Sequence, residues 1–143
     1  MVRLPAKIAL STLALLGAAQ LVPVARTNPP VESDVPAPPE VKAVLRRACY
    51  DCHSHETVWP AQAYLAPASW LVAHDVKEGR EELNFSLWGR MDPQRTAKKA
   101  RKLRSEVGEG DMPPWYYVLA HPAARLSDAD RALLTSWADG LGR

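Results

Sequence analysis

Two cysteines and a histidine lie together in one short stretch, Cys49-Tyr50-Asp51-Cys52-His53. Positions 49 and 52 are three residues apart, which places both sulfurs on one face of a helical turn. From that face both thiols can add to the two vinyl groups on one edge of a porphyrin, and the imidazole of His53 can bind the iron from below. The spacing therefore predicts one covalent c-type haem, with Cys49 and Cys52 as thioether positions and His53 as proximal ligand.

The same two cysteines allow three other interpretations: a structural disulfide, half of a zinc site, and a thioredoxin-like redox pair. Zinc would need two further ligands, for example His55 and His74. A thioredoxin-like pair follows a strand, whereas the segment before Cys49 has a helical pattern. None of the three explains why a histidine directly follows the second cysteine. The chain contains two cysteines in all, so no thiol remains for a second disulfide or a four-cysteine zinc site.

The second axial ligand of the iron is expected to be a methionine, because low-spin cytochromes c use a thioether sulfur there. Beyond the initiator the chain offers Met91 and Met112. Met112 precedes two prolines that stiffen its loop, whereas Met91 precedes a helix cap and is expected to fill a gap in the core. We therefore predict Met112 as the ligand, with His74, His121 or an open position as alternatives.

The other candidate side chains have structural interpretations as well. We expect His74 to be buried on an apolar helix face, His55 to lie in a polar loop near the haem edge, and His121 to bond a backbone carbonyl. Trp59 or Trp115 could donate an indole N–H to a haem propionate.

A run of basic residues follows position 92: Arg95, Lys98, Lys99, Arg101, Lys102 and Arg104. Such a run is either a docking surface for an acidic redox partner or a membrane, or an ordinary solvated helix face.

The N-terminal residues 1–25 have the layout of a secretory signal, with Arg3 and Lys7 before a 15-residue apolar run from 8 to 22. A cleaved signal peptide and a retained membrane anchor both fit, although about 20 residues are needed to span a bilayer. Either one places the globular part outside the cytoplasm, on the periplasmic side of the bacterial inner membrane. Residues 26–35 are a Pro-rich linker or a wrap over the domain surface, and residues 36–143 are the haem-binding domain.

The domain is predicted to be all-α, because apolar residues recur at helical spacing and sustained alternation of period two is missing. We expect helices over 40–52, from 67–69 to Gly79, from Asp92 to Val107, and after a Ser127 cap. Residues 111–122 are expected to form a loop.

The formal charge of +2 comes from Arg3 and Lys7, since the chain from residue 26 onward has 16 basic and 16 acidic residues. That balance argues against a nucleic-acid partner.

Several blocks together resemble the small bacterial haem-binding domain family, whose members carry a CxxCH motif in a cytochrome c-like architecture. The resemblance runs from about residue 20 to the C-terminus. Its blocks are residues 49–57, 66–71, 75–80 and 83–86, the segment Met112-Pro113-Pro114, and the helix from Leu126 to Trp137. It implies covalent haem at Cys49 and Cys52 with His53 as the proximal ligand. It implies neither a reaction nor a partner.

We therefore expect an exported haem protein that carries single electrons to an unidentified redox partner protein, and that is not an enzyme. No catalytic residue is assigned. The alternatives are a peroxidase-like haem enzyme, which would use His74 and Arg80 beside an open iron position, and a haem- or gas-responsive binding module.

Overall fold

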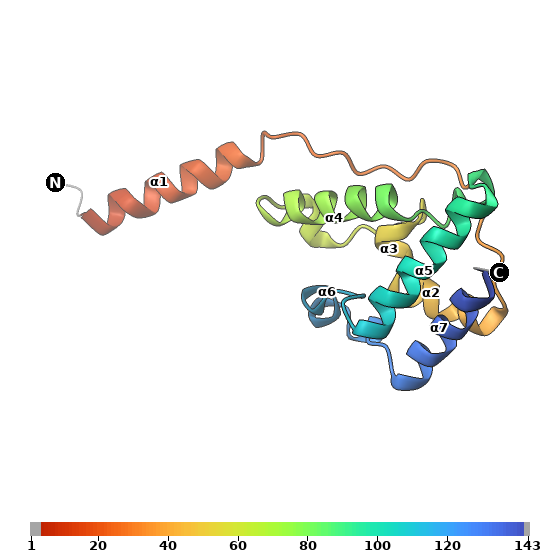
Figure 1. Cartoon of the computed structure of the whole chain (residues 1–143). Coiled ribbons are helices and arrows are strands. Elements are labelled where there is room, and N and C mark those ends of the chain that lie inside the picture. The colour runs from red at the N-terminus through yellow and green to blue at the C-terminus, as the bar shows by residue number, and fades with distance from the viewer. Residues whose placement is uncertain (1–3, 142–143) are drawn as a thin grey trace.

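All the regular elements in residues 4–141, the range that the computed structural model describes, are helices (Figure 1). One isolated parallel bridge, between Ser33 and Leu87, is the β interaction found in that range. The prediction of an all-α chain is therefore confirmed. The helices are α1 (Leu4–Ala19), α2 (Pro39–Ala48), α3 (Tyr50–His53), η1 (Ala61–Tyr64), α4 (Ala68–Glu82), η2 (Trp88–Arg90), α5 (Pro93–Glu109), α6 (Trp115–Ala120), η3 (Pro122–Ala124) and α7 (Asp128–Leu141).

The core lies between α2, α5 and α7. The apolar stripe of α2 is buried as its spacing predicts, and Leu45 of α2 and Leu134 of α7 have no exposed surface. Burying one leucine contributes about 1.5–3 kcal/mol. Because α2 is held in the core along its whole length, the chain enters the CxxCH turn from a fixed position.

The Pro-rich segment before α2 wraps over the domain surface, which was one of the two alternatives. Val35 is buried, and the Asp34 carboxylate accepts hydrogen bonds from Tyr50 Oη (2.6 Å) and Lys42 Nζ (2.7 Å). Burial and the Asp34 carboxylate raise the pKa of Tyr50 well above its ordinary value. Tyr50 therefore remains a hydrogen-bond donor at any physiological pH.

Helix α1 projects away from the domain (Figure 1), and residues 5–18 are exposed. None of the helices in the described part of the chain is both long and apolar enough to qualify as a candidate membrane span. Arg3 lies outside the described residues. The signal or anchor role of this segment stays a prediction.

Three predicted boundaries were wrong. The helix predicted over 40–52 is broken at Cys49, whose φ of −129° separates α2 from α3. Helix α4 does not end at Gly79 but continues to Glu82. Residues 115–120 form α6 rather than a loop, because Pro114 stands directly before its first turn, where a missing N–H costs no hydrogen bond.

The predicted helix caps are confirmed. The Asp92 side chain accepts a hydrogen bond from the Arg95 N–H (2.7 Å). Helix α5 continues two residues past its predicted end at Val107, and Gly110 follows it with φ 89°, a conformation that glycine adopts without strain. Ser127 Oγ accepts from the Asp130 N–H at 3.1 Å, while the Asp130 carboxylate accepts from the Ser127 N–H at 2.8 Å. These reciprocal bonds form a capping box at the start of α7.

Asp130 also ties α7 to α2, because its carboxylate lies 2.7 Å from Arg47 Nη2. Arg47 and the Ser127 donors lower the pKa of Asp130 from 3.8 to about 2. Since the folded-state pKa lies below the ordinary value, this carboxylate stabilises the fold above about pH 4, and the contribution disappears as the pH falls toward 2.

We predict that Asp130→Asn lowers the free energy of unfolding by about 1 kcal/mol at pH 7 and that the difference from wild type vanishes near pH 2. Urea unfolding followed by circular dichroism between pH 2 and 7 measures it. Asp128→Asn, in the same turn, is the control. A difference that does not change with pH would contradict the assignment.

Candidate functional site

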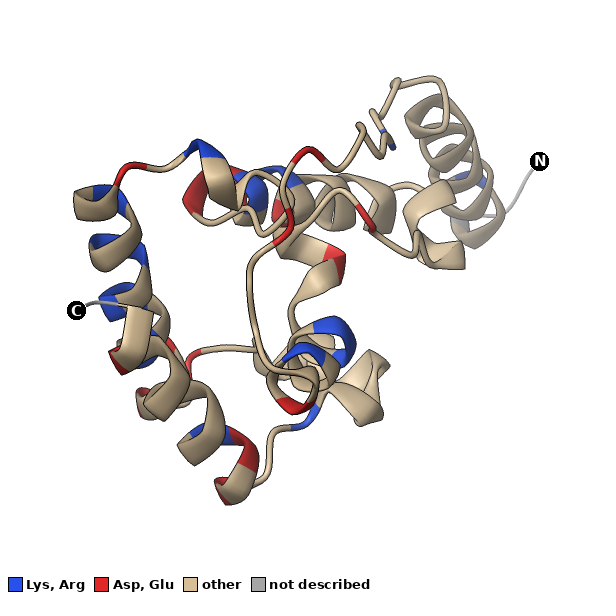
Figure 2. Cartoon of the chain, turned by 90° about the vertical axis from the view of Figure 1, so that its right-hand side faces the viewer, with Lys and Arg blue, Asp and Glu red and all other residues tan. Residues whose placement is uncertain are grey.

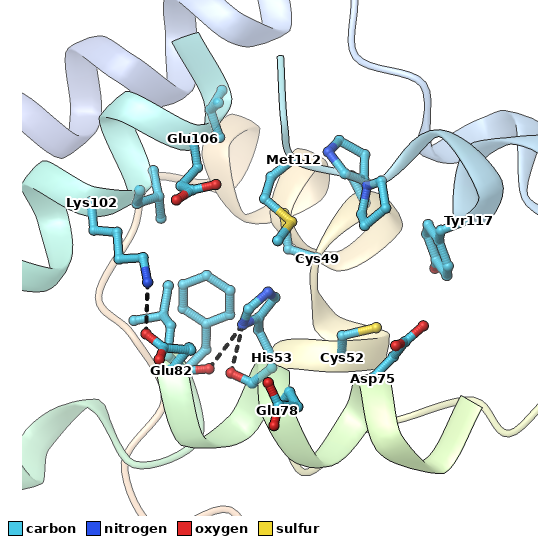
Figure 3. A pocket seen from close by; sticks show the side chains of 18 of the residues that line it. Cys49, Cys52, His53, Asp75, Glu78, Glu82, Lys102, Glu106, Met112 and Tyr117 are labelled. Atoms are coloured by element: carbon cyan, nitrogen blue, oxygen red, sulfur yellow. Dashed lines mark hydrogen bonds and ion pairs between the residues drawn. The ribbon is translucent and has the colours of Figure 1, made fainter. Parts of the chain in front are cut away.

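The CxxCH motif folds as a tight turn at the end of α2. The Cys49 carbonyl accepts hydrogen bonds from the N–H groups of Cys52 (3.2 Å) and His53 (2.9 Å). Both cysteines are free and partly buried, and they line one cavity together with His53. The structure therefore brings the three predicted attachment residues to the same space (Figure 3).

The imidazole of His53 is fixed in one orientation by α4 and by the residue that follows it, Leu83. Its Nδ1 lies 2.8 Å from the Gly79 carbonyl oxygen and 3.0 Å from that of Leu83. Both partners are acceptors, so Nδ1 carries the proton and Nε2 keeps a free lone pair. Burial lowers the pKa of His53, which favours the neutral ring that metal binding requires. His53 Nε2 is therefore free to bind a metal.

Helix α4 can supply these carbonyls because it contacts the CxxCH turn at very close range. A Cβ atom at position 79 would lie 2.5 Å from the Cys52 carbonyl oxygen. Only glycine allows this approach. The Phe85 N–H also donates to the His53 carbonyl oxygen at 2.8 Å, and the Phe85 ring packs edge-on against the imidazole with centroids 6.3 Å apart. The turn is therefore held on two sides.

The cavity above the imidazole has a volume of about 300 Å³. Met112 lines it, and Figure 3 shows its side chain on the other side of the cavity from His53. The Glu106 carbonyl accepts from the N–H groups of both Asp111 (2.9 Å) and Met112 (3.1 Å), which holds the loop on the end of α5.

A second contact fixes the loop on its other side. Tyr117 Oη of α6 donates to Asp51 Oδ2, inside the CxxCH motif, at 2.7 Å. The segment that carries Met112 is therefore tied to the turn that carries His53.

The chemistry of this donor set fits a covalently attached haem. Two thiols, one imidazole nitrogen with a free lone pair and one thioether sulfur face a single cavity with mainly apolar walls. Burial raises the pKa of both Cys49 and Cys52 to about 12, so both are neutral thiols in the folded chain. The rim of the cavity is charged, with Lys102 2.8 Å from the Glu82 carboxylate. Glu78 and Glu106 line the cavity as well (Figure 3).

The zinc alternative finds no support in the geometry. Within residues 4–141 no three His, Cys, Asp or Glu side chains are grouped so that they could hold a metal ion. His55 is engaged elsewhere, with its two ring nitrogens 2.9 Å from the Pro30 carbonyl oxygen and 2.9 Å from Asn84 Nδ2.

Two other histidines lie near the cavity or in the following loop. His74 lines the cavity but is exposed, so the expectation that it is a buried core residue was wrong. The reason is that α4 packs through Ser69, Val76 and Gly79, which leaves position 74 on the outer face. His121 stacks on Tyr117 and its Nδ1 lies 3.2 Å from the Tyr117 carbonyl, as expected of a loop anchor.

Arg80 has a structural role that the sequence did not indicate. Its guanidinium donates to the carbonyls of Ser54 (2.7 Å) and Thr27 (2.8 Å), to Asn28 Oδ1 and to Thr57 Oγ1. It joins the N-terminal segment to the loop after the motif and does not line the cavity.

The remaining candidates are placed as follows. Met91 packs against the core, as predicted. Trp115 is 77% exposed, and the buried indole N–H of Trp59 has no acceptor but lies outside the cavity lining. Within the basic run of α5, Lys99 and Lys102 pair with Glu82, and Arg104 pairs with Asp139. These ion pairs favour the solvated-face interpretation of the run.

Sequence reasoning missed the positioning residues. Gly79 and Leu83 act through their backbone carbonyls, and Tyr117 acts through a hydroxyl on a distant segment. Neither kind of contact produces a recognisable sequence motif. The one available signal was a glycine inside a helical pattern, which often marks a close approach.

The helical fold and this donor set define a small haem-binding protein. The comparison of sequences agrees, because the family model of the haem-binding domain matches residues 14–140. The chain belongs to the haem-binding domain family. Comparison with curated proteins and with solved structures gave no match.

We predict that Gly79→Ala destabilises the fold by about 1–3 kcal/mol, because the added methyl group must push α4 away from the Cys52 carbonyl. The shift also removes an acceptor from His53 Nδ1. Urea unfolding measures the stability, and the visible spectrum of the haem-loaded chain shows whether His53 still binds the iron.

Gly140→Ala in α7 is the matched control, because nothing lies within 4 Å of the Cβ that would be added there. It should leave stability unchanged or raise it by about 0.5–1 kcal/mol. A Gly79→Ala variant as stable as wild type would show that the close approach does not position His53.

Proposed function

We propose that the protein is a c-type cytochrome that works outside the cytoplasm and passes single electrons to a partner protein. One observation carries the proposal: two thiols and an imidazole whose Nδ1 is already held by two carbonyls face the same cavity. Haem supplies reversible one-electron chemistry when it is bound.

Each residue of the site has a distinct task in this proposal. Cys49 and Cys52 would hold the haem edge through two thioethers, and His53 Nε2 would bind the iron. Met112 would supply the opposite ligand, whose soft sulfur favours the ferrous state. The apolar walls would keep water from the iron, and the hydrogen bonds to His53 Nδ1 would hold the imidazole plane and strengthen its donor character.

The peroxidase-like alternative loses support from the position of one residue. Such an enzyme would use Arg80 beside the open iron position, yet the four hydrogen bonds of Arg80 hold it outside the cavity lining. In this proposal Met112, which lines the cavity, would occupy the position at the iron that such an enzyme needs open. We therefore favour electron transfer over catalysis.

Location outside the cytoplasm rests on the N-terminal sequence, with Lys7 before an apolar run that lies mostly in α1.

The redox partner is expected to dock where the haem edge would be accessible, at the rim that carries Glu78, Glu82, Lys102 and Glu106. This mixed rim favours a partner with complementary charges of both signs.

We predict that the haem-loaded wild type is six-coordinate and low-spin, with a thioether-to-iron charge-transfer band that Met112→Ala abolishes. Met91→Ala is the control, because Met91 packs against the core and not into the cavity. That variant should lose stability and keep the band. Absorption and magnetic circular dichroism of the ferric protein measure it.

A reversible one-electron potentiometric titration with no carbon monoxide binding in the wild type would support the carrier role. High-spin wild-type iron that binds carbon monoxide would contradict it and favour an enzyme or a sensor.

A further inference from the structure

The large exposed apolar side chains of the domain gather on one face, around α6, η1 and the start of α4. We define this apolar face by residues that are each at least 41% exposed: Val58, Tyr64, Leu65, Trp70, Leu71, Trp115, Tyr116 and Leu119. Within residues 32–141, α2, α5 and α7 carry no large apolar residue of comparable exposure. Charged residues lie on α4 as well as on those three helices, and Figure 2 shows few of them near α1.

Members from three of the four segments that form the apolar face meet around one hollow, and Trp115 packs edge-on against Tyr116 with ring centroids 5.8 Å apart. A second cavity, of about 240 Å³, is lined jointly by Val58, Leu71 and Tyr116, with Gln62 of η1 and Ala120 of α6. Exposed apolar side chains that cluster on a soluble domain often mark an interaction site.

Helix α1 leaves the domain at the edge of this face and is fixed there. The Gln20 side chain bonds the Ala66 backbone in both directions, accepting from its N–H (3.0 Å) and donating to its carbonyl (3.2 Å). Arg26 donates to the Ala63 carbonyl at 3.0 Å, and its guanidinium lies 4.6 Å from the centre of the Tyr64 ring. The end of α1 is therefore part of the folded domain, and the family match, which begins at residue 14, includes it as well.

We propose that α1 is retained in the mature protein and that the apolar face rests on a lipid bilayer into which α1 inserts. Beyond Lys7, α1 is apolar on all sides apart from Ser11 and Thr12, and a helix of that kind is stable in a protein core or in lipid. No part of the described domain covers it, since residues 5–18 are exposed. Gln20, at the end of α1, is bonded to Ala66. If α1 lies in the bilayer, the neighbouring Tyr64, Leu65 and Trp70 therefore lie at the bilayer surface.

The composition of the face fits a membrane interface better than a protein partner. Tryptophan and tyrosine are enriched where lipid meets water, and arginine places its charge there while its stem stays apolar. At 1.5 Å per residue α1 is about 24 Å long, less than the roughly 30 Å of a bilayer core.

Site-specific photo-crosslinking tests the contact in the full chain. A benzophenone amino acid replaces Leu119 in one variant, Leu65 in a second, and Arg101, exposed on α5, in the control. The haem-loaded variants are placed in phosphatidylcholine–phosphatidylglycerol liposomes and irradiated. We expect the mass of one phospholipid to be added to the first two variants and not to the control.

Hydrogen exchange of the unmodified chain gives a second measurement that needs no substitution. Liposomes should slow exchange in η1 and α6 and leave α7 unchanged. The proposal is overturned if the benzophenone at positions 65 and 119 gives no lipid adduct, or if it crosslinks two copies of the chain instead. It is also overturned if the chain isolated from cells lacks the residues before Gln20. The absorption spectrum of each sample reports haem attachment separately, so a failure of the cytochrome assignment is distinguishable from a failure of the lipid contact.

Discussion

The site depends on one interaction, in which His53 Nδ1 donates to the carbonyl of Gly79 in α4 and to that of Leu83, the residue that follows α4. A histidine side chain that follows a short helical turn would otherwise be free to rotate, and either nitrogen could carry the proton. The carbonyls of Gly79 and Leu83 fix both the tautomer and the ring plane. Their position depends in turn on the missing side chain at Gly79, which lets α4 approach the Cys52 backbone.

The rest of the fold holds the two ends of this arrangement in place. Helix α2 is buried against α7 and brings the chain to Cys49, and the ion pair between Arg47 and Asp130 ties the same two helices at the surface. On the opposite side, the hydrogen bond between Tyr117 and Asp51 connects the Met112 segment to the motif. Such contacts between helices stabilise a domain of this size, whose hydrophobic core is small.

Local chemistry made part of the structure predictable from the sequence. The caps at Asp92 and Ser127 and the apolar stripe of α2 depend on neighbouring residues, and the structure shows each of them. The spacing of Cys49, Cys52 and His53 predicts a shared site, and the three residues line one cavity. Features that depend on contacts between distant segments could not be predicted. The spacing around Gly79 predicts a helix end, because the contact of Gly79 with Cys52 joins segments that are distant in the sequence.

Two further errors had the same origin. His74 was expected in the core because its neighbours are apolar, but α4 turns another face inward. The prolines at 113 and 114 indicated a loop, yet Pro114 stands where a helix can begin, and α6 follows it.

The most direct test of the haem assignment is the intact mass of the chain, purified from cells that can attach c-type haem, after extraction with acidified organic solvent. Thioether bonds survive that treatment, whereas a haem held only through its iron is lost. We predict a chain that stays red and whose mass is raised by one haem, with neither thiol open to alkylation. A colourless chain with two alkylated cysteines would contradict the account.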